Sequence, residues 1–157
     1  WDKQIYFPPI EPLRRRALFI EETLRRFRDR GGLDVDVRDS VSRSELAREL
    51  DEATVFAYPM DTTQWSEGFS CSTLEAYAAK ACPITTDADA FASVYGDALP
   101  LVPRVGDWAP RWRESVIRGL TDEKWRNEVN ERAHAFATER TWKATASKLM
   151  AAIQERL

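Results

Sequence analysis

The sequence has little of the material from which metal sites, disulfide frameworks and nucleophilic triads are built. Its 157 residues include one histidine and two cysteines. His134 stands among alanines and a phenylalanine, so we interpret it as structural, and no Ser-His-Asp or Cys-His arrangement can be built around it. Cys71 and Cys82 suggest neither a disulfide framework nor a zinc site. We therefore expect a reducing compartment, which predicts a cytoplasmic protein.

A strong charge of one sign and long apolar runs are also missing. The net charge of -3 gives no general reason to expect a nucleic-acid partner, although residues 14–30 are locally rich in arginine. No apolar run approaches the roughly 18 residues of a membrane span, and no signal peptide is recognisable. The length fits one domain with a proper core. Because the chain begins with Trp1, we expect it to be part of a longer protein.

Segments with the hydrophobic spacing of a helix alternate along the chain with segments that have the pattern of a strand. Apolar residues at three- and four-residue steps predict a helix over 13–27, which Gly31 and Gly32 would end. Ser42 and Glu45 form a capping-box pattern that predicts a helix over 42–50. Further helices are predicted over 69–80 and 89–95, and three more in the tail, at 112–120, 125–136 and 142–153.

Strands are predicted at 4–7, 33–39, 54–59, 83–86 and 98–102. The run at 54–59 is continuously apolar, which predicts a strand buried on both faces. Strands and helices that alternate over short connections are typical of a parallel sheet. We therefore predict the α/β class: a Rossmann-like parallel sheet flanked by helices over 1–105, with a helical C-terminal tail over 106–157, in one domain.

Parallel sheets of this kind bind ligands at the carboxyl ends of their strands. The segment EGFSCSTLE, residues 67–75, follows one such end and opens the predicted helix 69–80. Gly68, Phe69, Ser70 and Cys71 fall at or before its first turn, where amide groups lack partners within the helix. Those amides and the helix dipole predict an anion site that a diphosphate can approach closely.

Two glutamates flank this anion site. Glu67 would repel a phosphate, so we expect it to point beyond the phosphate and accept hydrogen bonds from sugar hydroxyls. Glu75 lies about one and a half turns inside the helix and is suited to a second pair of hydroxyls, such as those of a ribose. Sugar, diphosphate and ribose together describe a nucleotide sugar.

Each glutamate also has an ordinary interpretation. A carboxylate at a helix start commonly complements the dipole, and one in mid-helix is commonly solvated. The segment around Glu75, GFSCSTLEAYAAKA, is however almost apolar on all sides, which predicts a buried helix. Because a buried lone carboxylate needs a partner, this setting favours a binding role for Glu75.

The run from about Leu46 to Pro103 resembles the donor-binding half of retaining glycosyltransferases with the GT-B fold, of the large GT4 type. The family pattern is an apolar strand ending in proline, then a glutamate, seven residues and a second glutamate followed by alanine. Here these are VFAYP and EGFSCSTLEAYAAKACPITTD, followed by VYGDALPLVP. The ending FATERTWKATASKL is similar to the closing tryptophan-containing helix of the family.

The resemblance implies a transferase that moves a sugar from a nucleotide-diphosphate sugar to an acceptor hydroxyl, with no metal and no cofactor. It implies that Glu67 contacts the transferred sugar near the reacting face, as a positioning group rather than a nucleophile. It also implies that the amides of Phe69, Ser70 and Cys71 hold the distal phosphate and sugar, and that Glu75 holds the ribose. The acceptor domain of such enzymes precedes this region, in the same chain or a separate one, and without it this chain alone is expected to bind a nucleotide but not to be active.

The family also uses an arginine and a lysine after the first strand to neutralise the leaving diphosphate. The glycine-arginine and lysine-glycine pair is absent here, and Arg14, Arg15 and Arg16 are the candidates to replace it. An ordinary solvated helix start is the other interpretation of these arginines. The segment DADAFASVYGD also departs from the family, because an apolar residue replaces a carboxylate.

Two other functions stay open. The chain is alternatively a non-catalytic, Rossmann-like regulatory or scaffolding domain, which the altered segments near 8–16 and 87–94 would suit. A nucleotide-sugar epimerase of similar shape is a third alternative, but such enzymes lack the two-glutamate motif. Nucleotide binding through Glu75 distinguishes the first two.

Overall fold

The computed structural model describes residues 10–30, 36, 41–60, 69–88, 90–96 and 98–156. The chain divides into two compact units, residues 1–41 and residues 42–157, which are described separately. In the first unit the described element is helix α2 (Ile10–Asp29), which confirms the helix predicted over 13–27. The strands predicted at 4–7 and 33–39 lie outside the described residues, apart from Asp36.

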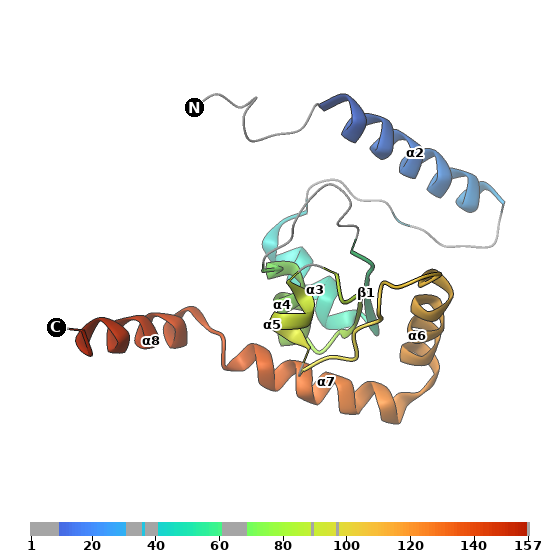
Figure 1. Ribbon diagram of the computed structural model, residues 1–157. Helices are drawn as coiled ribbons and strands as arrows, with labels where there is room; N and C mark the ends of the chain where they lie inside the picture. Colours follow the sequence, from blue (N-terminus) through green and yellow to red (C-terminus); the bar gives the residue numbers. More distant parts are fainter. Residues whose placement is uncertain are drawn as a thin grey trace. The chain divides into compact units, whose positions relative to one another are not determined.

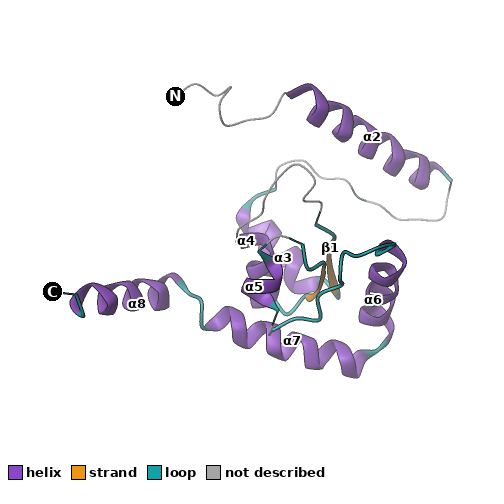
Figure 2. Ribbon diagram, in the orientation of Figure 1, coloured by secondary structure: helices purple, strands orange, loops and turns teal. Residues whose placement is uncertain are grey.

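The second unit is built on a small parallel sheet, as the sequence predicts (Figure 2). Strand β1 (Val55–Tyr58) pairs with β2 (Cys82–Thr85), in a register that places Val55 beside Cys82. All of β2 is buried, whereas β1 is half-buried and exposes Ala57. The prediction that 54–59 is buried on both faces is therefore wrong, because Ala57 is exposed and the other residues of β1 are only partly buried.

The strand predicted at 98–102 is reduced to one parallel bridge, between Thr86 and Val102. The amide of Leu99 donates to Tyr95 and that of Leu101 donates to the carbonyl of Leu99, so both are used in turns. Pro100 between them has no amide hydrogen to give to a neighbouring strand. The amide of Val102 does join the sheet, by donating to the carbonyl of Thr85 at 3.0 Å, so the segment forms a single bridge instead of a ladder.

Among the described residues of this unit, five helices lie around the sheet, namely α3 (Arg43–Glu52), α4 (Cys71–Ala78), α5 (Phe91–Tyr95), α6 (Ala109–Thr121) and α7 (Glu123–Thr138) (Figure 1). The last helix, α8 (Trp142–Gln154), extends away from the sheet. Helices α4 and α6 pack on both strands, α7 packs on β2 and on α4 and α6, and α3 packs on α4. The predicted capping box is confirmed, because Ser42 and Glu45 exchange hydrogen bonds at the start of α3.

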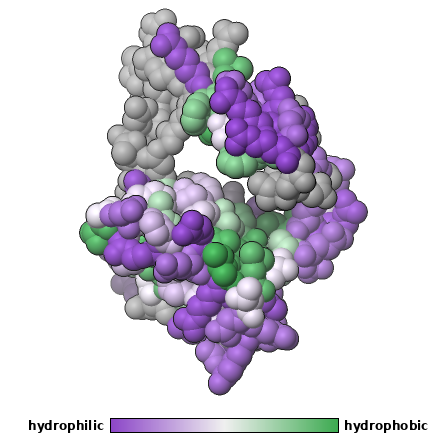
Figure 3. All heavy atoms as spheres, turned by 90° about the vertical axis from the view of Figure 1, so that its right-hand side faces the viewer, coloured by the Kyte–Doolittle hydropathy of each residue, from purple (hydrophilic) through white to green (hydrophobic). Residues whose placement is uncertain are grey.

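Gly119 allows α6 to lie close to the sheet. It is buried, and a Cβ atom added there would lie 3.1 Å from Cγ2 of Val55 and 3.7 Å from Sγ of Cys82. Figure 3 looks at the side of the unit on which α6 lies, where a small apolar area is bordered by polar side chains. The exposed apolar residues of α6 are Ile117 and Leu120.

An aromatic cluster joins α4, α5 and α7 in the core. The ring centroid of Tyr95 lies 4.9 Å from that of Phe91, 5.5 Å from that of Tyr77 and 5.4 Å from that of Phe136. Offset and edge-on ring pairs of this kind stabilise a core beyond the area they bury. The hydroxyl of Tyr95 also donates to the carbonyl of Ser70 at 3.1 Å, directly before α4. The cluster therefore holds the beginning of α4 as well as its body.

The two buried tyrosines of this cluster predict opposite effects of the same substitution. Tyr95→Phe removes the hydrogen bond to Ser70, so we expect the free energy of unfolding to fall by about 1 kcal/mol. The hydroxyl of Tyr77 is buried and bonds to no described residue, and burial raises its pKa. Tyr77→Phe should therefore leave the free energy of unfolding unchanged or raise it by up to about 1 kcal/mol.

Urea denaturation of the wild type and both variants at pH 7 measures these differences, provided that the m-values agree. An equal loss of stability in the two variants would show that the Tyr77 hydroxyl has a partner in solution.

Candidate functional site

The carboxyl ends of β1 and β2 are tied together by polar contacts. The amide of Met60 donates to Oγ1 of Thr86 at 3.3 Å, and Nη1 of Arg104 donates to the carbonyl of Met60 at 2.8 Å. The amide of Arg104 donates to Oδ1 of Asp87 at 2.7 Å, and its guanidinium lies over the ring of Trp108. These contacts fix the point at which the chain leaves β1 on its way to α4.

The first turn of α4 is capped from inside the core. Oγ of Ser70 accepts a hydrogen bond from the amide of Thr73 at 3.3 Å and another from the Thr73 hydroxyl at 3.0 Å. Both residues are fully buried. Because this cap uses the amide of Thr73, the amides of Cys71 and Ser72 are the two in the first turn that lack an acceptor within the helix. The side chain of Cys71 is exposed at this end of the helix.

Glu75 lies one turn behind the cap. Its side chain is half-buried and makes no hydrogen bond or ion pair with a described residue. The prediction that this helix is buried on all sides is wrong, because Cys71, Ser72 and Ala78 are exposed. Helix α4 packs on the sheet and α7 through one side, which buries Thr73 and the residues after Glu75. Glu75 stands at the border between the buried and exposed sides.

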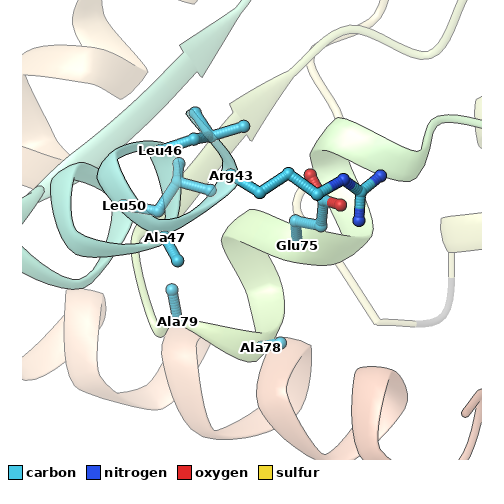
Figure 4. Close-up of a pocket in the computed structure, with 7 residues that line it drawn as sticks. All are labelled: Arg43, Leu46, Ala47, Leu50, Glu75, Ala78 and Ala79. Carbon is cyan, nitrogen blue, oxygen red and sulfur yellow. The ribbon is translucent and has the colours of Figure 1, made fainter. Parts of the chain in front are cut away.

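Two hollows meet at Glu75. The first, the α3/α4 hollow, has a volume of about 340 Å³ and is shown in Figure 4. It is lined by Arg43, Leu46, Ala47, Leu50, Glu75, Ala78 and Ala79. The second, the α4/α8 hollow, has a volume of about 680 Å³ and extends from the first turn of α4 to the start of α8. Its lining includes Phe69, Cys71, Glu75, Arg140 and Trp142. A ligand on the exposed side of α4 therefore has room on both sides of Glu75.

The structure brings part of the predicted site together. Phe69, Ser70 and Cys71 lie together at the beginning of α4 and Glu75 follows in its body, with Ser70 buried, Phe69 and Cys71 exposed and Glu75 half-buried. Glu67 and Gly68 lie outside the described residues, so their predicted roles stay predictions.

The three candidate arginines belong to the first unit. Arg15 lies on α2 and is exposed, and the side chains of Arg14 and Arg16 are outside the description. Because α2 is part of the first unit and α4 part of the second, the proposed contact of these arginines with a diphosphate is not tested.

Sequence reasoning missed Arg43 and Ser72. Ser72 has no distinguishing signal, since serines are common near a helix start. The sequence alone could have drawn attention to Arg43. It directly follows the capping residue Ser42, and it places a cation where the helix dipole disfavours one. Its nearness to Glu75 is not readable from the sequence, because the packing of α3 on α4 creates it.

The described residues give little support to metal binding or to a chemical role for the histidine. They contain no group of three or more histidine, cysteine or acidic side chains that could hold a metal ion. Nδ1 of His134 lies 3.0 Å from the carbonyl of Ala78, which agrees with a structural role in joining α7 to α4. No helix in the described part of the chain is long and apolar enough to cross a membrane.

Comparison with protein families gives one assignment. The family model described as glycosyl transferases group 1 matches residues 15–122, which is more than half of the chain and includes β1, α4 and β2. Comparison with curated proteins and with solved structures gives no match. The matched region contains the capped start of α4, Glu75 and the α3/α4 hollow. The chain belongs to the glycosyl transferases group 1 family, whose chemistry is the transfer of a sugar.

Proposed function

We propose that this chain is the donor-binding domain of a retaining, metal-independent glycosyltransferase of the GT4 type. It holds a nucleotide-diphosphate sugar while the sugar passes to an acceptor hydroxyl. The observation that carries the proposal is Glu75, a carboxylate that pairs with no described residue and lies behind a capped helix start, at the meeting point of two hollows. No cofactor takes part, and the nucleotide sugar is a substrate.

The diphosphate binds at the beginning of α4. The amides of Phe69, Ser70 and Cys71, with that of Ser72, present hydrogen-bond donors and the positive end of the helix dipole to an anion. Glu75 follows Cys71 by four residues, which is about 6 Å along a helix axis. Its two carboxylate oxygens accept hydrogen bonds from the two ribose hydroxyls. A ligand with an anion and a diol a few bonds apart suits this arrangement, and a nucleotide has both.

The same amides stabilise the leaving group. The acceptor oxygen forms a bond to the anomeric carbon, on the face from which the diphosphate departs, and the acceptor proton passes to the leaving phosphate oxygen. Negative charge that develops on that phosphate is stabilised by preorganised amides. Glu67 positions the transferred sugar through its hydroxyls, Gly68 lets the diphosphate approach the backbone, and Arg14, Arg15 or Arg16 supplies the neutralising charge. The acceptor site belongs to an amino-terminal domain, in the same chain or a separate one.

One observation favours a second candidate, a regulatory or scaffolding domain that has kept the fold without the chemistry. Where the family resemblance leads us to expect a carboxylate after the strand at 83–86, this chain has the segment that begins α5. Phe91 in that segment is fully buried in the aromatic core, so it offers no polar contact to a sugar. A domain of this second kind need not bind a nucleotide through Glu75.

A thermal-shift titration separates these candidates. We expect UDP, GDP or ADP, at about 100 times its dissociation constant, to stabilise the fold by about 2.7 kcal/mol, which corresponds to a rise in Tm of about 5–10 °C. Glu75→Ala should abolish the rise, because the ribose loses its acceptor. Glu75→Gln, which keeps the shape but loses the charge, should retain part of it.

Glu128→Ala is the matched control. Glu128 is an exposed helical glutamate of α7 that lines neither hollow, so its substitution should leave the rise unchanged. A rise that survives Glu75→Ala would remove Glu75 from the donor site. No rise with any nucleotide or nucleotide sugar would favour the regulatory or scaffolding domain.

The two cysteines provide an independent readout. Cys71 is exposed in the first turn of α4, whereas Cys82 is buried in β2, and burial raises its pKa to about 11. At pH 8 a thiol reagent should modify Cys71 and spare Cys82 in the native protein. Nucleotide at 100 times its dissociation constant should slow the modification of Cys71 by up to about 100-fold, because about 1% of the protein stays unliganded.

Cys71→Ser is the control, since it should leave only the slow, buried thiol. Modification of Cys71 at an unchanged rate, under conditions where Tm rises, would place the nucleotide away from the first turn of α4.

A further inference from the structure

Arg43 occupies an unusual place beside the proposed ribose site. It is the first residue of α3, and its side chain points across the α3/α4 hollow toward Glu75 (Figure 4). Neither side chain makes a hydrogen bond or ion pair with a described residue. Arg43 and Glu75 are the two charged groups that line the hollow, so a donor and an acceptor stand side by side with their bonding capacity unused.

The backbone that carries Arg43 is held firmly. Oγ of Ser42 accepts a hydrogen bond from the amide of Glu45 at 3.2 Å, and the amide of Ser42 donates to Oε2 of Glu45 at 2.9 Å. This reciprocal cap fixes the first turn of α3, whose dipole disfavours a cation at that position. The exposed guanidinium of Arg43 is therefore carried by a helix turn that is held in place. Its unfavourable interaction with the helix dipole lowers the stability of α3, and binding of a ligand would offset this loss.

The rest of the hollow is apolar. Leu46, Ala47 and Leu50 of α3 face Ala78 and Ala79 at the end of α4 (Figure 4). The volume of about 340 Å³ lies at the lower end of the range for small-ligand sites, roughly 300–1,000 Å³. Apolar walls with one cation and one carboxylate at the rim suit a flat, partly polar group better than a phosphate or a metal ion.

We propose that Arg43 reads the base of the donor nucleotide and that the base lies in the α3/α4 hollow. The proposal rests on the proposed function, in which Glu75 holds the ribose and the first turn of α4 holds the diphosphate. The base is attached to the ribose away from the phosphate, and the α3/α4 hollow is open to it on the α3 side of Glu75. Arg43 is thereby a specificity-determining residue that touches the substrate away from the reacting atoms.

The chemistry of arginine limits which bases fit. A guanidinium has five N–H donors and no acceptor. It pairs well with the carbonyl oxygens of uracil or thymine, with O2 and N3 of cytosine, and with O6 and N7 of guanine, whereas N7 of adenine lies beside an amino group that would present a donor to it. The donor is therefore a uridine, thymidine, cytidine or guanosine diphosphate sugar, and adenosine diphosphate is disfavoured.

Calorimetric titration of the full chain with UDP, dTDP, GDP, ADP and CDP tests this proposal. The wild type should bind at least one of UDP, dTDP, GDP and CDP about ten- to hundredfold more tightly than ADP. Arg43→Gln, which offers both a donor and an acceptor, should bring the five affinities close together. Arg43→Glu should weaken UDP and dTDP relative to ADP, because a carboxylate cannot donate to their carbonyl oxygens and accepts from the amino group of adenine.

Arg48→Glu is the matched control, since it makes the same charge change at an exposed position of α3 that does not line the hollow. It should leave the order of affinities as in the wild type. Unliganded Tm values should agree among all variants within a few degrees, because the substituted side chains are exposed.

The outcomes separate the two proposals. Equal affinity for all five diphosphates in the wild type, or an equal loss for all five in Arg43→Glu, would overturn base reading by Arg43. In that case the proposed donor site would still be supported, provided that Glu75→Ala abolishes nucleotide binding. Absence of binding by every diphosphate would overturn the donor site and the base-reading role together.

Discussion

The first turn of α4 is held by a hydrogen bond from the core. The Tyr95 hydroxyl donates to the carbonyl of Ser70, while the side chain of Ser70 caps the helix through Thr73. Because Tyr95 also packs on rings from α4, α5 and α7, the helix start moves only if the aromatic cluster moves. The anion site and Glu75 are both set by that helix, so their spacing depends on how well the core is packed.

Helix α4 is short and serves two environments. Thr73, Ala76 and Tyr77 are buried, whereas Cys71 and Ala78 face solvent and the two hollows. A helix of eight residues has too few turns for the buried and exposed residues to occupy different ends. They occupy different sides of the helix instead. Glu75 stands at the border, where its side chain is partly exposed to solvent and partly covered. Because it keeps this contact with water, a carboxylate that pairs with no described residue can lie beside an apolar hollow.

Short sequence patterns predicted the helices and most strands well, but they predicted less well how each one is buried and packed. The capping box of Ser42, the apolar run of β1 and the three tail helices were readable because each depends on neighbours in sequence. The burial of α4 was mispredicted, because apolar composition does not say which side another element will cover. The strand at 98–102 was mispredicted because its amides are used in turns around Pro100. Arg43 was missed because its relation to Glu75 arises only from packing.

The site depends on a helix that lies beyond the region matched to the family. That region ends at residue 122, one residue before α7 begins. Yet α7 packs on α4 and β2, and supplies Val129, Ala133 and Ala137 to the core. His134 bonds to the carbonyl of Ala78 at the end of α4, and Lys80 just after it pairs with Glu131 at 2.9 Å. The family pattern thus contains the residues of the proposed site, whereas the side chains that keep α4 in place come partly from outside it. The proposed donor binding would therefore depend on the α4–α7 pair, because the motif around Glu75 has its geometry only when α7 covers the inner side of α4.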